Sequence, residues 1–379
     1  MTLDPVALTQ ALVRCPTVTP DAGSALDLLE RTLVPLGFRC ERPRFEGNGS
    51  YPVENLLAKL GEGAPHLAFA GHVDVVPPGD RSAWRLDPFS GEIQGGLLFG
   101  RGAADMKSGV AAFVAAVART GRPPKGAVSL LITGDEEGEA VNGTQRLLAW
   151  AAERGERFDA CLVGEPTCPH ELGDVAKIGR RGSVTCRLVV RGRQGHTAYP
   201  QRADNAAHRL VAVLQALIDA RLDDGTDWFE PSSLQLTSID IGNPAGNVIP
   251  GEATVRFNIR FNDRHTKDSL ERWLHERIAP LAGSYELEVA GNAEAFVTAP
   301  GRLSELLVAS VEQETGRRPS LNTSGGTSDA RFVRRYCPVI EFGLVGSTMH
   351  QADEHVALAD IEGLTRIYAT FLRRFFAGP

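Results

Sequence analysis

Histidine and acidic residues stand in five short segments of this chain, most of them bounded by glycine. The segments cover residues 71–74, 102–107, 135–138, 164–166 and 349–350. Together they supply two imidazoles and several carboxylates, which are ligands that Zn²⁺ takes in proteins. A pair of such ions can activate water and polarise a carbonyl group. The segments therefore predict a metal-dependent hydrolase.

Several of these segments follow apolar runs that we expect to be buried strands. Consecutive apolar residues, as at 67–70, are typical of a strand covered on both faces. Strands are expected over residues 54–60, 67–76, 128–133 and 160–163, and helices over 4–13, 25–36, 105–118 and 142–154. This alternation favours an α/β sheet with helices on both faces. Ligands of open α/β sheets bind at the carboxyl ends of the strands.

Each candidate residue also has an ordinary structural explanation. His72 alone could lie in a surface turn, and Asp105 could cap a helix. The acids at 135–137 could form a solvated loop before a helix N-terminus. A late histidine such as His350 is usually structural when it stands alone. The metal site is favoured because His or acidic residues follow several expected strand ends together.

The sequence pattern changes near residue 177. Residues 183–190 and 285–289 alternate apolar and polar side chains, strands are expected at 233–241 and 253–261, and amphipathic helices at 203–220 and 267–278. This β-α-β-β-α-β order matches a small two-layer α+β module. Helix and strand alternation resumes after residue 293. We therefore predict a discontinuous domain, residues 1–178 and 293–379, with an inserted module at 179–292.

Composition excludes several classes of function. The 379 residues include 42% hydrophobic and 23% charged residues, as in ordinary globular proteins, and the net charge of −7 argues against nucleic acid as a partner. The most apolar helical run is too short to cross a bilayer, and the N-terminus does not resemble a signal peptide. Six scattered cysteines form no CxxC motif. We expect a cytoplasmic protein without a membrane or nucleic-acid partner.

Five segments resemble, in order and at similar spacing, those of the zinc-dependent aminoacylase and carboxypeptidase family with two co-catalytic metals. They are GHVDVVPPGD, FGRGAADMKSG, TGDEEG, VGEPT and MHQADE. The resemblance extends over essentially the whole chain. It implies a zinc-peptidase-like catalytic domain, with a mixed sheet flanked by helices, and an inserted dimerisation domain. It also implies two Zn²⁺ ions per subunit, with Co²⁺ possible in one site.

The resemblance implies which residues hold these metals. Asp105 would bridge both ions. His72 and Glu165 would complete one site, and Glu137 and His350 the other.

The same resemblance implies the residues that act on the substrate. Glu136 would be the general base. Asp74 would orient His72, because residues i and i+2 of a strand face the same side. His196, in the inserted module, would reach a neighbouring subunit's active site to stabilise the oxyanion, and Asn247 would share that function.

Four further segments resemble the members of this family that act on an N-succinylated diamino diacid. They are KIGRRGS, QGHTAYP, GNVIP and SGGTSDARF. Arg180 and Arg260 are the predicted ligands of the substrate carboxylates, because guanidinium binds carboxylate bidentately. Gly326 and Thr327 would add N–H and hydroxyl donors. A solvated surface charge, or a plain turn at the glycines, is the alternative for each.

The expected protein is thus a homodimeric amide hydrolase of lysine biosynthesis. A sister deacylase, such as N-acetylornithine deacetylase or a general aminoacylase, is the nearest alternative. The metal motifs barely distinguish these enzymes, whereas residues 180–183 and 324–332 favour the succinylated substrate. A non-catalytic, metal-stabilised binding protein is a more remote alternative, and it would not need a base such as Glu136.

Overall fold

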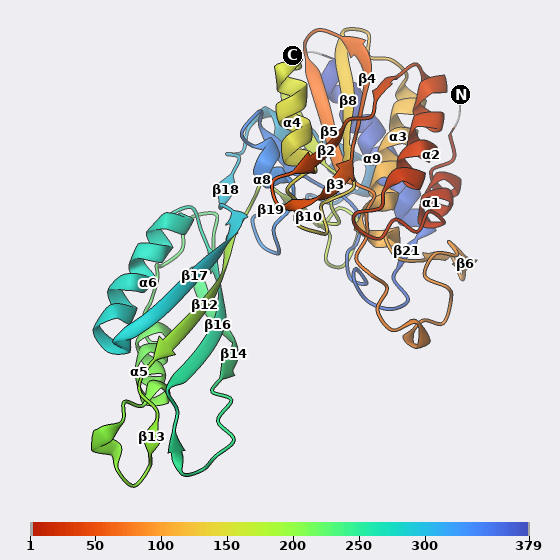
Figure 1. Ribbon diagram of the computed structural model, residues 1–379. Helices are drawn as coiled ribbons and strands as arrows, with labels where there is room; N and C mark the ends of the chain where they lie inside the picture. The colour runs from red at the N-terminus through yellow and green to blue at the C-terminus, as the bar shows by residue number, and fades with distance from the viewer. Residues whose placement is uncertain (1–2, 378–379) are drawn as a thin grey trace. The chain divides into compact units, whose positions relative to one another are not determined.

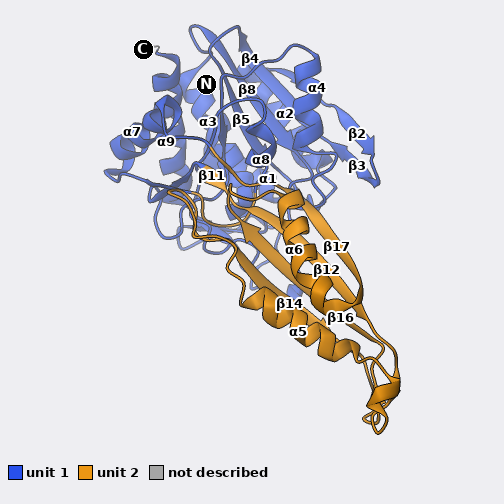
Figure 2. Cartoon of the chain, turned by 90° about the vertical axis from the view of Figure 1, so that its left-hand side faces the viewer, with its two compact units in different colours: residues 1–178, 298–322, 328–379 blue, residues 179–297, 323–327 orange. Residues whose placement is uncertain are grey.

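The computed structural model describes residues 3–377 and divides into two compact units (Figure 2). Unit 1 comprises Met1–Ile178, Thr298–Asn322 and Ser328–Pro379, and unit 2 comprises Gly179–Val297 and Thr323–Thr327. The inserted module was expected to end at residue 292, which is five residues too early. Strand β18 (Phe296–Val297) belongs to unit 2 because it pairs antiparallel with β11 (Gly179–Arg180).

Unit 1 contains an eight-stranded mixed sheet in the order β1-β4-β8-β5-β9-β20-β10-β19. The strands are β1 (Arg39–Glu41), β4 (Leu56–Glu62), β5 (His66–His72), β8 (Gly126–Thr133), β9 (Ala160–Val163), β10 (Val175–Lys177), β19 (Ser320–Asn322) and β20 (Val339–Glu341). The four central strands β8, β5, β9 and β20 are mutually parallel and buried along their whole length. Their carboxyl ends therefore meet at one edge of the sheet.

Helices flank this sheet, with α4 on one face and α3 and α9 on the other (Figure 1). The helices of unit 1 are α1 (Pro5–Val13), α2 (Gly23–Leu33), α3 (Ser108–Thr120), α4 (Thr144–Glu153), α7 (Arg302–Thr315), α8 (Ala330–Val333) and α9 (Leu358–Phe376). Phe69 of β5 stacks on Phe113 of α3 with ring centroids 4.1 Å apart, and Tyr368 of α9 meets both rings edge-on. This architecture confirms the predicted fold class. Among the described residues, no helix is both long and apolar enough to span a membrane.

Unit 2 has an antiparallel sheet in the order β14-β16-β12-β17, accompanied by two helices. The elements are β12 (Gly182–Arg191), α5 (Ala206–Ile218), β14 (Ser233–Asp240), β16 (Glu252–Phe261), α6 (Lys267–Ala282) and β17 (Ser284–Ala293). Alternate side chains of β12 and β16 are buried in one apolar core with both helices. The order of elements is the β-α-β-β-α-β order expected from the alternating pattern.

Short strands complete the two units. They are β2 (Arg44–Gly47), β3 (Ser50–Glu54), β6 (Ile93–Gln94), β7 (Leu97–Phe99), β13 (Gly195–His196), β15 (Val248–Ile249) and β21 (His355–Ala357). Strand β21 pairs with β7, which brings the late segment near residue 350 beside residues 97–99 in unit 1.

Candidate metal centre

The predicted metal ligands gather at the carboxyl edge of the central strands. His72 is the last residue of β5, Glu137 follows the end of β8, and Glu165 follows the end of β9. Asp105 lies in the helical turn η3 (Ala103–Lys107), and His350 lies in the segment between β20 and β21. Asp105 does not cap α3, whose N-cap is Lys107. Five segments far apart in the sequence therefore supply one cluster.

Asp105 stands between the two histidines of this cluster. Its Oδ1 lies 3.2 Å from Nε2 of His72, and its Oδ2 lies 3.5 Å from Nε2 of His350. Glu165 Oε1 is 3.8 Å from the same nitrogen of His72, and Glu137 Oε1 is 2.9 Å from that of His350. Two groups result, and each could hold a metal ion: His72 with Asp105 and Glu165, and His350 with Asp105 and Glu137.

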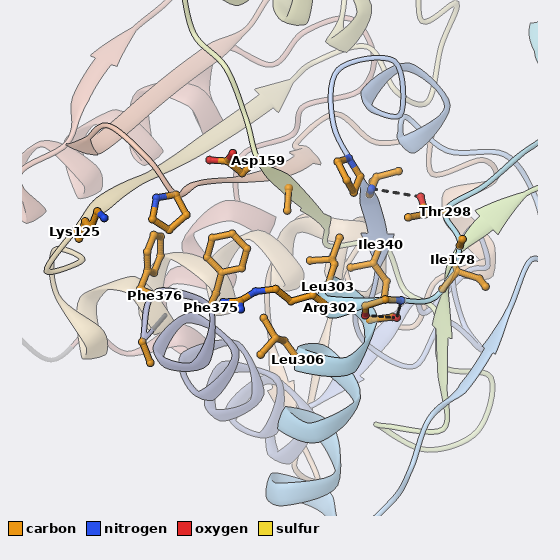
Figure 3. A pocket seen from close by; sticks show the side chains of 18 residues that line it. Lys125, Asp159, Ile178, Thr298, Arg302, Leu303, Leu306, Ile340, Phe375 and Phe376 are labelled. Carbon is orange, nitrogen blue, oxygen red and sulfur yellow. Dashed lines mark hydrogen bonds between the residues drawn. The ribbon is translucent and has the colours of Figure 1, made fainter. Parts of the chain in front are cut away.

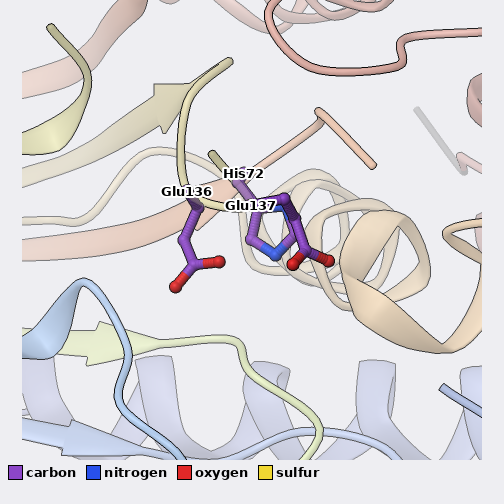
Figure 4. A group of neighbouring side chains, drawn as sticks. All are labelled: His72, Glu136 and Glu137. Atoms are coloured by element: carbon purple, nitrogen blue, oxygen red, sulfur yellow. The ribbon is translucent and has the colours of Figure 1, made fainter. Parts of the chain in front are cut away.

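Glu136 joins the same cluster from the loop after β8. Ligand atoms of His72, Glu136 and Glu137 also lie within 4.8 Å of one another. Figure 4 shows the carboxylates of both glutamates close to the imidazole ring. The structure therefore places the predicted base directly beside the predicted ligands.

Glycines in the motifs let the turn η3 pack directly on the strand ends. A Cβ added at Gly71 would lie 2.6 Å from the Met106 methyl carbon, and one at Gly164 would lie 2.8 Å from the same atom. Helix α3 approaches equally closely, because a Cβ at Gly109 would lie 2.6 Å from the carbonyl oxygen of Gly164. This close packing puts Asp105 within reach of both histidines.

Asp74 lies beside His72 and also contacts the loop that carries Glu136. His72 Nδ1 lies 2.9 Å from the main-chain oxygen of Asp74 and 3.6 Å from its carboxylate. Strand β5 ends at His72, so the strand argument for the Asp74 side chain does not apply. The carboxylate also accepts the main-chain N–H groups of Glu136 and Glu137 and the Thr19 hydroxyl. Asp74 thus holds the loop that carries the predicted base, and its effect on His72 stays a prediction.

A buried ion pair next to the cluster was not predicted from the sequence. Glu354 is fully buried and accepts a hydrogen bond from Arg101 at 2.5 Å. Its other oxygen accepts the main-chain N–H groups of Ala104 and Asp105, and Arg101 also donates to the carbonyl of His350 at 3.3 Å. The pair therefore fixes the backbone at Asp105 and at His350. Glu354 lies in the quoted segment MHQADE, but its partner is 253 residues away.

Burial makes several carboxylates of the cluster difficult to ionise. Withdrawal from solvent raises the pKa of Asp74 to about 6 and raises the pKa values of Glu136 and Glu165 well above the usual range. Hydrogen bonds with Asp105 and Glu137 raise the pKa of His350 to about 10. The cluster therefore favours the binding of a cation.

The donor set fits divalent metal ions. Carboxylate oxygens and imidazole nitrogens are suitable ligands for Zn²⁺ and related ions. Nearby dications would also lower the cost of ionising like-charged acids within a few ångströms of one another.

The predicted substrate ligands all belong to unit 2. Arg180 donates to the carbonyl oxygen of Gly326 at 3.1 Å, so these two residues are in contact. The Thr327 hydroxyl oxygen is buried without a hydrogen-bond partner within the part of the chain described. Burial and the positive charge of Arg181 lower the pKa of Arg260. Such crowding of guanidinium groups favours binding of an anion.

His196 and Asn247 lie in another part of unit 2. Strand β13, which ends at His196, pairs with β15, and Thr197 N–H donates to the carbonyl of Asn247 at 3.0 Å. His196 is exposed, and its Nδ1 accepts the N–H of Ala198 at 3.0 Å. In the neutral ring the proton is then on Nε2, which is directed away from this local bond.

A family model now assigns the class of this protein. The model of peptidase family M20/M25/M40 matches residues 68–374, and the chain belongs to that family. Among curated proteins, the succinyl-diaminopimelate desuccinylase of Rhodospirillum centenum is 57% identical over 382 residues, which cover 100% of this chain and 99% of that relative. The enzyme of the same name from Rhodopseudomonas palustris is 54% identical over 381 residues, with 98% of each chain covered. These relatives confirm the resemblance found in the motifs.

Solved structures share the fold at low sequence identity. An M20 family metallo-carboxypeptidase from Sulfolobus solfataricus superimposes with a TM-score of 0.82 at 16% identity, over 99% of this chain and 100% of the other. A dinuclear metal-binding M20 peptidase from Bacillus subtilis gives a TM-score of 0.73 at 13% identity, over 99% and 98%. These similarities support the architecture alone.

Proposed function

We propose that this chain hydrolyses N-succinyl-LL-2,6-diaminopimelate to succinate and LL-2,6-diaminopimelate, a step of lysine biosynthesis in the cytoplasm. The observation that carries the proposal is the 57% identity with a desuccinylase over the complete length of the chain. The acidic cluster in unit 1 is consistent with amide hydrolysis.

Two Zn²⁺ ions per subunit are proposed as the cofactors, with Co²⁺ able to replace one of them. His72 and Glu165 would hold one ion, Glu137 and His350 the other, and Asp105 both. The two carboxylate oxygens of Asp105 lie near different histidines, which supports the bridging role. Bound divalent ions would polarise the amide carbonyl and lower the pKa of water.

Glu136 is the proposed general base. It accepts a proton from the attacking water and then delivers that proton to the amine nitrogen as the C–N bond breaks. Its carboxylate lies beside the predicted ligands, and its N–H is held by Asp74 at 3.3 Å. Bound cations would lower its raised pKa and keep the carboxylate ionised in the resting enzyme.

Unit 2 supplies the proposed contacts to the substrate carboxylates. Arg180 and Arg260 would each bind a carboxylate, and Gly326 and Thr327 would add main-chain and hydroxyl donors. The buried, unsatisfied hydroxyl of Thr327 supports this assignment. Nε2–H of His196, with Asn247 beside it, would stabilise the oxyanion in the site of the neighbouring subunit.

A homodimer is therefore part of the proposal. Large apolar side chains are exposed on unit 2, among them Val211 (63% exposed) and Ile218 (57%) of α5 and Ile239 (56%) of the edge strand β14. An apolar surface next to a sheet edge suits a contact between two copies. Light scattering of the wild type should give twice the chain mass of 40.7 kDa. A monomer at working concentration would refute both the dimer and the role of His196.

Substrate comparison tests the proposed activity. Protein reconstituted with Zn²⁺ should hydrolyse N-succinyl-LL-2,6-diaminopimelate with a higher kcat/KM than N-acetylornithine, and chelation of the metal should remove the activity. Faster turnover of N-acetylornithine would instead identify a sister deacylase. Tight Zn²⁺ binding without hydrolysis of either compound would identify a metal-stabilised binding protein.

A further inference from the structure

A cavity of about 680 Å³ opens at the opposite edge of the unit 1 sheet from the acidic cluster (Figure 3). Residues that precede or begin the four central strands line it, among them Pro65, Lys125, Ala160 and Val339. The seven residues of β5 separate this edge from His72, a distance of about 20 Å. The cavity is therefore distinct from the candidate metal centre.

Most of the remaining lining of this cavity, which we call the amino-edge cavity, is apolar or aromatic. Phe375 and Phe376 of α9 contribute one side, and Leu303 and Leu306 of α7 another. A second cavity of about 290 Å³ adjoins it, because Phe376 and Ala377 line both. Cavities of roughly 300–1,000 Å³ with mostly apolar walls are typical of small-molecule sites.

Positive charge surrounds both cavities, although the chain as a whole carries a net charge of −7. Lys125 and Arg302 line the larger cavity, and Arg122 and Arg373 the smaller one. Within residues 3–377, none of these four cations forms an ion pair at 4.0 Å or less. Figure 3 shows the Arg302 side chain extending alongside Phe375 and Leu306.

One acid lines the larger cavity, and it already has a partner. Asp159 Oδ2 accepts the main-chain N–H of His66 at 2.7 Å, which fixes the carboxylate at the start of β5. The first turn of α7, at Gly301 and Arg302, forms another part of the wall, and its dipole adds to the preference for negative charge. With Lys125 and Arg302 against Asp159, the charge of the lining is positive and favours an anion.

We infer that the amino-edge cavity binds a small organic anion with an apolar body, in which a carboxylate contacts Lys125 and Arg302 while the body packs on Phe375 and Phe376. Guanidinium and ammonium groups at the rim bind the charge, and the apolar walls bind the body. Because such a ligand binds the folded chain and not the unfolded chain, it also raises the temperature of unfolding.

A matched pair of probes tests this inference on the full-length protein. Phenylbutyrate and phenylbutanol share one carbon skeleton, and the first alone carries a charge. In isothermal titration calorimetry, phenylbutyrate should bind with one site per chain, and the alcohol about tenfold more weakly. Equal affinities, or binding of neither probe at millimolar concentration, would overturn the inference.

Variants locate the site. The double substitution Lys125→Gln and Arg302→Gln should abolish the preference for the carboxylate, whereas Arg31→Gln, an exposed site that lines neither cavity, should keep it. If the double variant does not fold, Lys125→Gln alone, at an exposed position, should weaken phenylbutyrate severalfold. Unchanged preference in a folded variant would contradict the assignment. A variant whose mass in solution differs from that of the wild type would also contradict it. That result would indicate that the cavity surface is an interface between copies of the chain.

Discussion

The carboxylate of Asp223 in unit 2 and the carboxylates of the acidic cluster in unit 1 are all withdrawn from solvent. They differ in the hydrogen-bond donors that surround them. Asp223 accepts hydrogen bonds from the N–H groups of Gly225 and Ser232 and from the Asn262 amide, and its Oδ2 lies 3.0 Å from His265 Nε2. Although burial opposes ionisation, these bonds lower the pKa of Asp223 to about 2.

Two acids of the cluster in unit 1 show the opposite behaviour, whereas Asp105 resembles Asp223: burial opposes its ionisation, but hydrogen bonds with His350 and His72 lower its pKa. Burial and neighbouring acids raise the pKa values of Glu136 and Glu165, since few local donors compensate them. A carboxylate that serves the fold is provided with donors by its own chain. Carboxylates that lack such donors and lie close together indicate a site for an external cation. The presence or absence of local donors therefore distinguishes Asp223 from Glu136 and Glu165.

Glu136→Gln should have the largest effect, and it tests whether an acid of the cluster without local donors serves catalysis. Loss of the base should lower kcat about 100- to 10,000-fold, while both metal ions remain bound. Steady-state kinetics and metal analysis of the purified variant measure the two effects. Glu139→Gln, at an exposed position in the same loop, is the matched control. Intact turnover in the Glu136 variant would remove this residue from its assigned function.

Glu354→Gln tests whether acids with local donors position the cluster. The change weakens the contact with Arg101 and with the N–H groups of Ala104 and Asp105, so we expect metal affinity to fall about 10- to 100-fold. Titration with a competing chelator measures that affinity. Asp353→Asn, which alters the neighbouring acid that contacts Arg85, should change metal affinity much less. Equal losses in both variants would contradict the positioning role.

Asp223→Asn tests the structural side of the comparison through pH. The pKa of Asp223 is lower in the folded protein than in the unfolded chain, so its contribution of about 2 kcal/mol is present above pH 4. It is lost as the pH falls from about 4 to 2. Calorimetric unfolding at pH 7 and pH 3 should therefore show a smaller difference between wild type and variant at the lower pH. If the Asp223 variant bound less metal than the wild type, Asp223 would not differ from the acids of the cluster as described.

Tyr51→Phe should have the smallest effect. Asp135 follows β8 like Glu136 and Glu137, but it accepts the Tyr51 hydroxyl at 2.6 Å and the N–H groups of Val141 and Asn142. It thus resembles Asp223 in its surroundings. Removal of one hydroxyl should cost about 1 kcal/mol of stability and leave metal content unchanged. Thermal unfolding and metal analysis measure both, and loss of metal would place Asp135 among the ligands.

Sequence patterns predicted the regular parts of the fold well. The strand expected over residues 160–163 matches β9, and the alternating runs of unit 2 match β12 and β17 in place. The short strands β1, β10 and β19 were missed because each has only three residues and depends on distant partners for its stability. The end of the insert was misplaced for the same reason, because β18 is defined by its pairing with β11.

The cluster itself could be predicted because its residues lie in short motifs after expected strands. Its supporting contacts could not. Arg101 and Glu354 are separated by 253 positions, and neither residue type indicates the other. The Asp74 side chain was expected to face His72 on the assumption that the strand continues. The strand ends at His72, but the Asp74 carboxylate still lies 3.6 Å from Nδ1 of His72 and also accepts the N–H of Glu136, so its effect on His72 stays a prediction.

The insertion of unit 2 between the predicted metal ligands also sets the order in which these ligands are synthesised during translation. The group of His72, Asp105 and Glu165 is complete once residue 165 has been synthesised. The group of Asp105, Glu137 and His350 must wait for His350, which follows Glu165 by 185 residues. At 5–20 residues per second, this delay is on the order of 10–40 s. A nascent chain therefore contains one predicted coordination group well before the other.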